Sequence, residues 1–398
     1  MTDEGAHMPN RETRHAELAE KYLPKGLLER FRERADVYDR ENRFFDEDLA
    51  ELTEQGYLTL FVPEEFGGPG LSLNEVSRLQ QRLATAAPAT ALAVNMHLMC
   101  IGVVSAMFAR GDRSLGYVFD EAMAGEIFAF GVSEPANDWV LQDSNTLAEP
   151  QEDGGYLLTG VKIFTSLSPV WTRLIAHGLD STDTANPTLV YGFLERSADG
   201  ISVSDHWDVL GMRASQSRTT ILTKVRMRPD RIARRMPTGR HPDLLTFAIT
   251  SHFQLLIGSV YAGLARRALE LAAQGLKSRS SAKSGTTYAE VPEFRARLAD
   301  AHMEYMAVPA QLDTYSRDVD DLVDHGAGWP LRLVSARLNA STVARHAVET
   351  ALVCAGGTGF NNTSELSRLH RDAAASLFHP PSADAARPMY ASALLDDN

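Results

Sequence analysis

Three side chains could handle a proton at neutral pH within largely apolar stretches of the sequence. His379 precedes a Pro-Pro pair in RDAAASLFHPP, His97 lies within ALAVNMHLMC, and Ser166 ends GVKIFTS. An imidazole titrates near neutrality, and both imidazole and hydroxyl groups can donate and accept hydrogen bonds. Each residue also has a plainer explanation, because a histidine on an apolar helix is usually a core residue, a proline ends a helix, and a hydroxyl often closes a strand. These residues therefore gain a role only from the elements that position them.

A Gly-Gly pair offers a different chemistry, the binding of an anion. Gly356 and Gly357 follow a long helical pattern, and their bare amides would let a phosphate approach closely. A Gly-Gly pair is also typical of an ordinary turn that ends a helix, so the pair alone does not establish a phosphate site. The histidines form no pair with metal-ligand spacing in a polar context, so we predict no metal site. Neither a GxSxG elbow nor a P-loop occurs.

The composition is that of an acidic globular protein. The chain has 398 residues and a formal net charge of −13, which argues against nucleic acid and against an anionic membrane as partners. Two cysteines, Cys100 and Cys354, are too few for a disulfide framework. The N-terminus has no basic region followed by an apolar one, and no apolar run approaches the ~20 residues of a membrane span. We expect a cytoplasmic enzyme.

Three regions with different patterning must position the candidate residues. Residues 1–127 have helical periodicity, interrupted by the turn-rich segment GYLTLFVPEEFGGPGLS. Residues 128–240 contain short β-branched and aromatic runs separated by Gly, Asp, Asn and Pro, which is typical of strands. Residues 241–398 return to long Ala-rich and Leu-rich helical segments. The sequence therefore predicts an α+β protein with an N-terminal helical domain, a middle β-domain and a C-terminal helical bundle.

This order of regions, together with several motifs, resembles the acyl-CoA dehydrogenase superfamily. The motifs stand in the family's order: FVPEEFGG at 61–68, VSEP at 132–135, GGYLLTGVKIFTS at 154–166, WDVLGMRASQS at 207–217, GLARRAL at 263–269 and AGGTGFNNTSELSRLHRDA at 355–373. The resemblance covers nearly the whole chain. It implies the acyl-CoA dehydrogenase fold, with a barrel-like β-sandwich between the N-terminal helices and a C-terminal four-helix bundle, and it implies a homotetramer or a dimer of dimers.

The resemblance also implies a flavin between the β-domain and the bundle. The residues that would line its isoalloxazine ring are Val132, Ser133, Phe164 and Ser166. Arg279 and the Gly356-Gly357 backbone would reach the flavin phosphates of a neighbouring subunit. The family has a glutamine before this Gly-Gly pair, on the adenine side, and this chain has Val353 there. The sequence thus leaves FAD and FMN as alternatives.

The substrate side departs from the dehydrogenases. An acyl-CoA dehydrogenase needs a carboxylate to remove the α-proton of the thioester. Matched to the family, one position for this base falls on Pro380, beside His379, and the other falls on Gln254. Neither residue can act as a carboxylate base. The loop that binds the thioester is replaced by EPANDWVL, in which Trp139 and Asp138 would crowd or repel a phosphopantetheine arm.

A different branch of the superfamily fits these departures. RDAAASLFHPP is similar to the late segment of two-component flavin monooxygenases, of the dibenzothiophene monooxygenase and amino-sugar N-oxygenase type. These enzymes take reduced flavin from a separate reductase and form a C4a-hydroperoxyflavin with O2, which survives only where water is excluded. The resemblance implies three roles: His379 handles the proton of the peroxide or substrate, Ser166 is its hydrogen-bond partner, and His97 orients the substrate.

We therefore predict a flavin-dependent monooxygenase that uses externally supplied reduced flavin and O2 to oxygenate a small organic substrate. One alternative is an acyl-thioester dehydrogenase or oxidase with a non-standard base, for which His379 is the candidate. A second alternative is a catalytically silent homologue that serves as a binding or scaffold subunit. The sequence does not distinguish oxygenation at carbon, nitrogen or sulfur.

Overall fold

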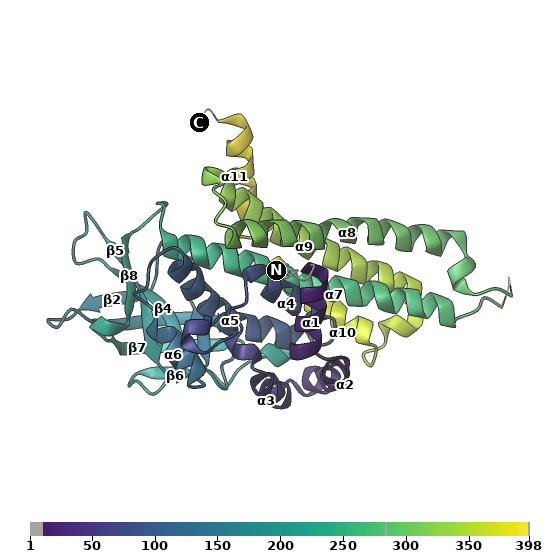
Figure 1. Cartoon of the computed structure of the whole chain (residues 1–398), viewed down its shortest axis with the longest axis horizontal. Coiled ribbons are helices and arrows are strands. Elements are labelled where there is room, and N and C mark those ends of the chain that lie inside the picture. Colours follow the sequence, from purple (N-terminus) through teal and green to yellow (C-terminus); the bar gives the residue numbers. More distant parts are fainter. Residues whose placement is uncertain (1–10, 283–284, 397–398) are drawn as a thin grey trace, which may run out of the picture.

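A computed structural model describes residues 11–282 and 285–396 of the chain. Figure 1 shows the strands gathered at one end of the molecule, with the long C-terminal helices extending to the other end. The helices before the sheet are α1 (Arg11–Tyr22), α2 (Lys25–Glu41), α3 (Asp46–Glu54), α4 (Leu73–Ala84), α5 (Pro88–Ala109) and α6 (Tyr117–Met123).

Local sequence signals explain where two of these helices begin. Ser72 precedes α4 and forms a capping box with Glu75, in which each side chain accepts a hydrogen bond from the other residue's backbone amide. Helix α5 starts at Pro88, whose missing amide proton costs nothing in the first turn. The body of α5 is apolar on every side and almost wholly buried. It is therefore a central core helix.

Two helices correct the expectation that no segment is long and apolar enough for a membrane span. Both α5 and α7 (Leu244–Ser278) pass that test by length and composition. Within the protein, however, 89% of the apolar window of α5 and 72% of that of α7 are buried. Burial in the protein core explains their apolar character without a membrane.

The strands are β1 (Phe128–Gly131), β2 (Leu147–Pro150), β3 (Tyr156–Thr165), β4 (Arg173–Asp180), β5 (Thr188–Glu195), β6 (Ile201–Val203), β7 (Arg218–Met227) and β8 (Ile232–Pro237). They form one sheet in the order β6-β7-β3-β2-β4-β5-β8, and β1 pairs in parallel with β4 beside this path. The eight strands of the described residues thus belong to one hydrogen-bonded sheet, which is the expected middle β-domain. The middle of β4 and β5 is buried throughout, which explains their nearly continuous apolar runs.

The C-terminal part consists of α7, α8 (Pro292–Asp320), α9 (Trp329–Ala355), α10 (Glu365–Ala374) and α11 (Ala383–Leu395). Asp243 caps α7 by accepting the amide of Leu245 at 2.8 Å. Helix α7 packs against α8 and α9 and also against α4 and α5, so it joins both helical parts of the chain. At Gly263 a Cβ atom would collide with the backbone carbonyl of Gln81, so the α4–α7 contact requires glycine there. Helix α11 projects from the bundle (Figure 1).

Candidate functional site

A cavity of about 1760 Å³ lies between the sheet and the C-terminal helices. Its walls come from the end of β1, the 138–142 loop, the 207–217 segment, the first half of α7, the turn before α11, and α11 itself. Pockets for a single small molecule usually measure roughly 300–1000 Å³. The cavity therefore has room for a flavin ring system and a second small molecule together.

All residues expected at the isoalloxazine ring line this cavity: Val132, Ser133, Phe164 and Ser166. Phe164 is 57% exposed and has a φ of +56°, which is uncommon for an aromatic residue. A register shift between β3 and β7 falls at Lys162/Thr165, next to this position. Such a bulge re-aims side chains, and here it presents an aromatic ring at the cavity surface, where a flat heterocycle could stack.

Three hydroxyl groups form a chain on the cavity wall. The Oγ atom of Ser166 lies 2.8 Å from that of Ser217, which lies 2.8 Å from that of Ser215. The segment carrying the last two is held to α10, because the carboxylate of Asp372 accepts the amide of Met212 at 2.5 Å. The GMRASQS and RDA motifs, far apart in sequence, are thus one structural unit beside the cavity.

His379 lines the same cavity and is half-buried. Its Nε2 atom lies 2.7 Å from the hydroxyl of Tyr261, so its partner is this tyrosine and not Ser166, which corrects the expected pairing. Burial, and then the positive charge of Arg337, lowers the pKa of His379 to about 3, so the ring is neutral at physiological pH. Burial raises the pKa of Tyr261, which stays protonated. Its hydroxyl has no other partner among the described residues, and donation to Nε2 places the proton of the imidazole on Nδ1.

The two positions at which a dehydrogenase would hold its base lie next to each other. The amide nitrogen of Gln254 donates to the carbonyl of Pro380 at 3.0 Å. The amide oxygen of Gln254 accepts from Nε of Arg337 at 2.7 Å, and Arg337 also donates to the carbonyl of Pro381. Arg337 is fully buried, and burial lowers its pKa to about 10, which leaves it charged. Gln254 is therefore a link between a buried cation and the turn that carries His379.

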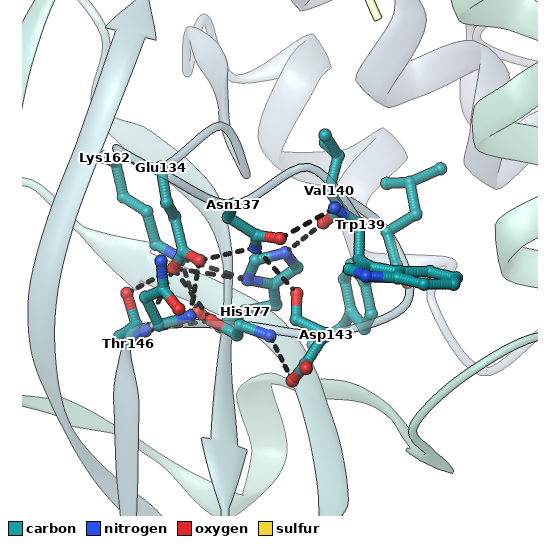
Figure 2. Close-up of polar contacts among 12 residues, drawn as sticks. Glu134, Asn137, Trp139, Val140, Asp143, Thr146, Lys162 and His177 are labelled. Atoms are coloured by element: carbon teal, nitrogen blue, oxygen red, sulfur yellow. Dashed lines mark hydrogen bonds and ion pairs between the residues drawn. The ribbon is translucent and has the colours of Figure 1, made fainter. Parts of the chain in front are cut away.

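The loop after β1 forms another part of the wall, with Asp138 and Trp139 at the cavity surface as expected. Trp139 is 57% exposed. Figure 2 shows how the base of the loop is held: the buried carboxylate of Glu134 accepts hydrogen bonds from Lys162 at 2.6 Å and from the Thr146 hydroxyl at 2.6 Å. It also accepts the side-chain amide of Asn137 at 2.8 Å. Despite its burial, these partners, Lys162 above all, lower the pKa of Glu134 to about 2.

His97 does not reach the cavity, which corrects its expected role as a substrate-orienting residue. Its ring is 1% exposed; Nε2 lies 2.9 Å from the carbonyl of Leu58, and Nδ1 accepts the amide of Phe128 at 3.0 Å. Both nitrogens are satisfied by backbone, and burial lowers the pKa of the ring to about 4. Leu92 and Met96 are the residues of α5 that line the cavity. His97 is a structural residue between α5, β1 and the 57–59 turn.

Arg279, Gly356 and Gly357 lie together, but away from the cavity. Arg279 follows the C-terminus of α7, whereas the last cavity-lining residue of α7 is Ile257, roughly 30 Å along the helix. One guanidinium nitrogen of Arg279 donates to the carbonyls of Cys354 and Ala355 at the end of α9. Gly356 has a φ of +62°. A contact between this cluster and a neighbour's flavin remains a prediction.

Sequence reasoning missed Tyr261, Arg337 and the two serines of GMRASQS. A signal existed for Tyr261, because it follows Gln254 by two helical turns and so lies on the same face of α7. Ser215 and Ser217 stand two positions apart in a motif that had already been singled out. Nothing local marks Arg337. Within residues 11–282 and 285–396 no group of three His, Cys, Asp or Glu side chains is placed to hold a metal ion.

Comparison with known proteins places these features in a family. The profile of the acyl-CoA dehydrogenase N-terminal domain matches residues 15–113, and that of the C-terminal domain matches residues 255–380. L-evernosamine nitrososynthase of a Micromonospora species is 28% identical over 365 residues, which cover 90% of this chain and 85% of that protein.

Two further proteins are similar to this chain. Dibenzothiophene monooxygenase of Rhodococcus erythropolis is 25% identical over 258 residues, 63% of this chain and 60% of that protein. The crystal structure of FMN-bound TdsC from Paenibacillus sp. A11-2 has a TM-score of 0.82 at 22% identity, covering 96% of this chain and 97% of that one. At this identity the likeness to TdsC shows the shared fold.

Proposed function

The chain belongs to the acyl-CoA dehydrogenase superfamily, and from that premise we propose that it is a flavin-dependent monooxygenase acting on a small organic molecule. The observation that carries the proposal is the Gln254–Pro380 contact. Both positions for a dehydrogenase base are occupied by residues that cannot take a proton from carbon, and both are committed to holding the turn that carries His379. The nitrososynthase and dibenzothiophene monooxygenase relatives support the same conclusion.

The cavity suits a flavin. Its volume exceeds that of one ligand, Phe164 offers an aromatic face, and the hydroxyls of Ser166 and Ser217 offer donors and acceptors at the ring's polar edge. Reduced flavin would supply two electrons to O2, so that one oxygen atom enters the substrate and the other leaves as water. FMN is the form we propose, because the FMN-bound TdsC has the same fold and Val353 replaces the family's adenine-side glutamine.

His379 would control the proton in this reaction. A neutral imidazole, held by Tyr261, can donate one proton and accept another without placing a fixed charge in the cavity. Phe253, Ile257 and Trp329 line the cavity, and beside these apolar side chains a bound flavin and substrate would limit the access of water. Ser166 would contact the flavin, and Tyr261, not Ser166, would hold His379.

We infer that the substrate is a largely apolar ring compound. Trp139, Phe247 and Trp329 line the cavity, and Arg240 and Arg371 are its arginines. Arg371 is already paired with Asp39 at 2.8 Å. A nucleotide diphosphate would need several free cations, so the cavity favours a neutral molecule over a nucleotide sugar.

The proposal also includes a source of electrons for the flavin and an oligomeric assembly of the chain. A separate flavin reductase would deliver the reduced flavin, and the chain would assemble as a homo-oligomer, of which a tetramer is our expectation. The compartment that we expect is the cytoplasm.

An anaerobic mixing experiment tests the function. The protein is loaded with reduced FMN, O2 is admitted, and the absorbance is followed through the return to oxidised flavin. We expect a transient spectrum distinct from both reduced and oxidised FMN. In His379→Ala this transient should decay at least about tenfold faster, with release of hydrogen peroxide in place of product.

His206→Ala, a change at an exposed histidine, is the matched control and should behave like the wild type. Bleaching of oxidised, protein-bound flavin by acyl-thioesters would instead establish a dehydrogenase. Failure to bind FMN in either redox state would leave a silent homologue. An unchanged transient in His379→Ala would remove His379 from the mechanism.

A further inference from the structure

The buried side chain of Lys162, in the sheet, fixes the tautomer of His177, a histidine to which the sequence alone assigned no role. Nζ of Lys162 lies 2.6 Å from a carboxylate oxygen of Glu134, 3.0 Å from Nδ1 of His177 and 2.7 Å from the carbonyl of His177 (Figure 2). An ammonium group has three protons, and these three acceptors use all of them. Nδ1 of His177 is therefore an acceptor, and the proton of the neutral ring is on Nε2.

That proton is used to hold the cavity wall. Nε2 of His177 donates to the carbonyl of Val140 at 2.6 Å. Burial, and then the charge of Lys162, lowers the pKa of His177 to about 4, so this arrangement persists at neutral pH. Val140 itself has a φ of +24°, a strained conformation for a β-branched residue that must be held by its surroundings.

A second strand holds the neighbouring carbonyl. The hydroxyl of Tyr191 donates to the carbonyl of Leu141 at 2.7 Å. Tyr191 is the direct partner of His177 in the β4–β5 pairing, and the two rings meet edge to face with centroids 5.0 Å apart. Two adjacent side chains of the sheet thus hold two consecutive carbonyls of the loop.

The held segment has no regular structure of its own. Residues 134–146 contain no helix or strand, and Trp139, Val140 and Leu141 line the cavity. Glu134 holds the base of the loop, through Asn137 and Thr146. The tip is also held at its two sides: Gly239 donates its amide to the carbonyl of Gln142 at 2.8 Å, and the side-chain oxygen of Asn137 accepts the amide of Trp139 at 2.9 Å. Between these contacts, His177 and Tyr191 hold the carbonyls of Val140 and Leu141. The contact from His177 is the one that falls on Val140, the residue next to Trp139, and it therefore bears directly on the position of Trp139.

We propose that His177 is a positioning residue for the substrate wall: it fixes the Trp139–Leu141 segment and so sets the shape of the cavity for an apolar ring compound. This inference rests on the proposed function in that it assigns the cavity to the substrate. The hydrogen bond from His177 to Val140 is present in the protein without ligand. Its test can therefore succeed or fail independently of activity.

The test compares two substitutions at one position. Glutamine in His177→Gln can accept from Lys162 with its oxygen and donate to Val140 with its nitrogen, whereas leucine in His177→Leu can do neither. The fluorescence of Trp139 is isolated by subtracting the signal of Trp139→Phe in each background. We expect His177→Leu to shift this emission to the red and to raise its quenching by acrylamide about twofold or more. His177→Gln should restore the wild-type signal.

A binding measurement connects the wall to the ligand. With indole as the probe in equilibrium dialysis, His177→Leu should bind about tenfold more weakly, while its FMN affinity stays within about twofold of the wild type. His177→Gln should recover indole binding. Absence of indole binding by the wild type would count against the proposed substrate class. The fluorescence result would still decide whether His177 holds the Trp139–Leu141 segment.

Either of two results overturns the proposal. Unchanged Trp139 emission and quenching in His177→Leu would mean that the loop keeps its place without the histidine. A glutamine variant as defective as the leucine variant would mean that ring packing, and not the hydrogen bond, matters. If His177→Leu does not fold, His177→Asn takes its place: its amide oxygen can still accept from Lys162, but its shorter side chain does not reach the carbonyl of Val140, and it should raise the quenching of Trp139 in the same direction. Unchanged quenching in that variant would equally overturn the proposal.

Discussion

Gln254 differs from a glutamate in one side-chain atom, and in our proposal that atom distinguishes a monooxygenase from a dehydrogenase. Its amide bridges the guanidinium of Arg337 and the carbonyl of Pro380, so both ends of the group are in use. A carboxylate there would accept from Arg337 but would face the carbonyl oxygen of Pro380 without a proton to share. The amide can therefore do what a carboxylate could not: it supports the turn that carries His379.

Gln254→Glu tests this account. The new carboxylate should pair with Arg337, whose charge lowers the pKa of His379, so that pKa should rise. A rise of about one unit is expected for loss of one nearby charge. NMR titration of the ring, assigned with His379→Gln, measures it. Gln274→Glu, an exposed change on the same helix, is the control.

The same variant also addresses the dehydrogenase alternative. Because its carboxylate would be neutralised by Arg337, we expect no reduction of oxidised flavin by acyl-thioesters. Reduction of the flavin in Gln254→Glu, and not in the wild type, would show that a single substitution restores a working base. An unchanged pKa of His379 would show that Arg337 does not act on it.

At the scale of elements, His97 joins three parts of the fold. Helix α5 carries it, and its ring nitrogens meet the carbonyl of Leu58 and the amide at the start of β1. The residues of α5 that line the cavity are instead Leu92 and Met96. The ring must be neutral to serve both backbone groups, since a protonated ring could not accept from Phe128.

His97→Gln should keep product formation within about twofold and change the pH dependence of stability, because an amide can serve both backbone groups without titrating. The pKa of His97 in the folded protein, about 4, lies below its ordinary 6.5. The neutral ring thus contributes stability that is present above pH 6.5 and lost as the pH falls towards 4. The free energy of unfolding, relative to the variant, should drop by about 3 kcal/mol over this range.

Urea unfolding of wild type and variant at several pH values measures this difference, in which all other titrating groups cancel. Parallel pH curves for the two proteins would contradict the assignment. A tenfold loss of product with normal FMN binding would restore His97 as a substrate-orienting residue.

At the scale of the whole molecule, two candidate flavin contacts lie at opposite ends of α7. The cavity involves residues up to Ile257, and Arg279 follows the end of the helix. Roughly 30 Å of helix separates them, a distance that one flavin ring cannot bridge within one chain. A role for Arg279 and Gly356 in holding flavin therefore requires a second copy of the chain.

Arg279→Gln should weaken FMN binding about tenfold in the assembled protein without altering the assembly, because a charged contact to phosphate would be lost. FMN fluorescence titration and native mass spectrometry measure the two quantities, with Arg266→Gln, an exposed change on α7, as the control. Unchanged FMN affinity would mean that Arg279 only caps α9, through the carbonyls of Cys354 and Ala355. Tight FMN binding by an isolated monomer would contradict the shared site.

The sequence by itself determined the family, the types of the elements and the missing carboxylate. Two of the motifs that carry the resemblance serve a fixed local geometry, the bulge beside Phe164 and the close approach at Gly263. The residue types at positions 254 and 380, glutamine and proline, are read directly from the sequence, and neither carries a carboxylate. The register of His379 relative to the RDA motif was also enough to predict that it belongs to the site, and the structure places it at the cavity.

Only the tertiary structure decided which side chains meet. Tyr261 lies 118 residues before His379, and Ser217 lies 51 residues after Ser166, so no local pattern pairs them. The orientation of His97 was undetermined for a further reason: α5 is apolar on every side, so helical periodicity gives it no face. Which way such a helix turns depends on the packing of all its neighbours, and that packing directs His97 to the backbone of Leu58 and Phe128, and Leu92 and Met96 to the cavity.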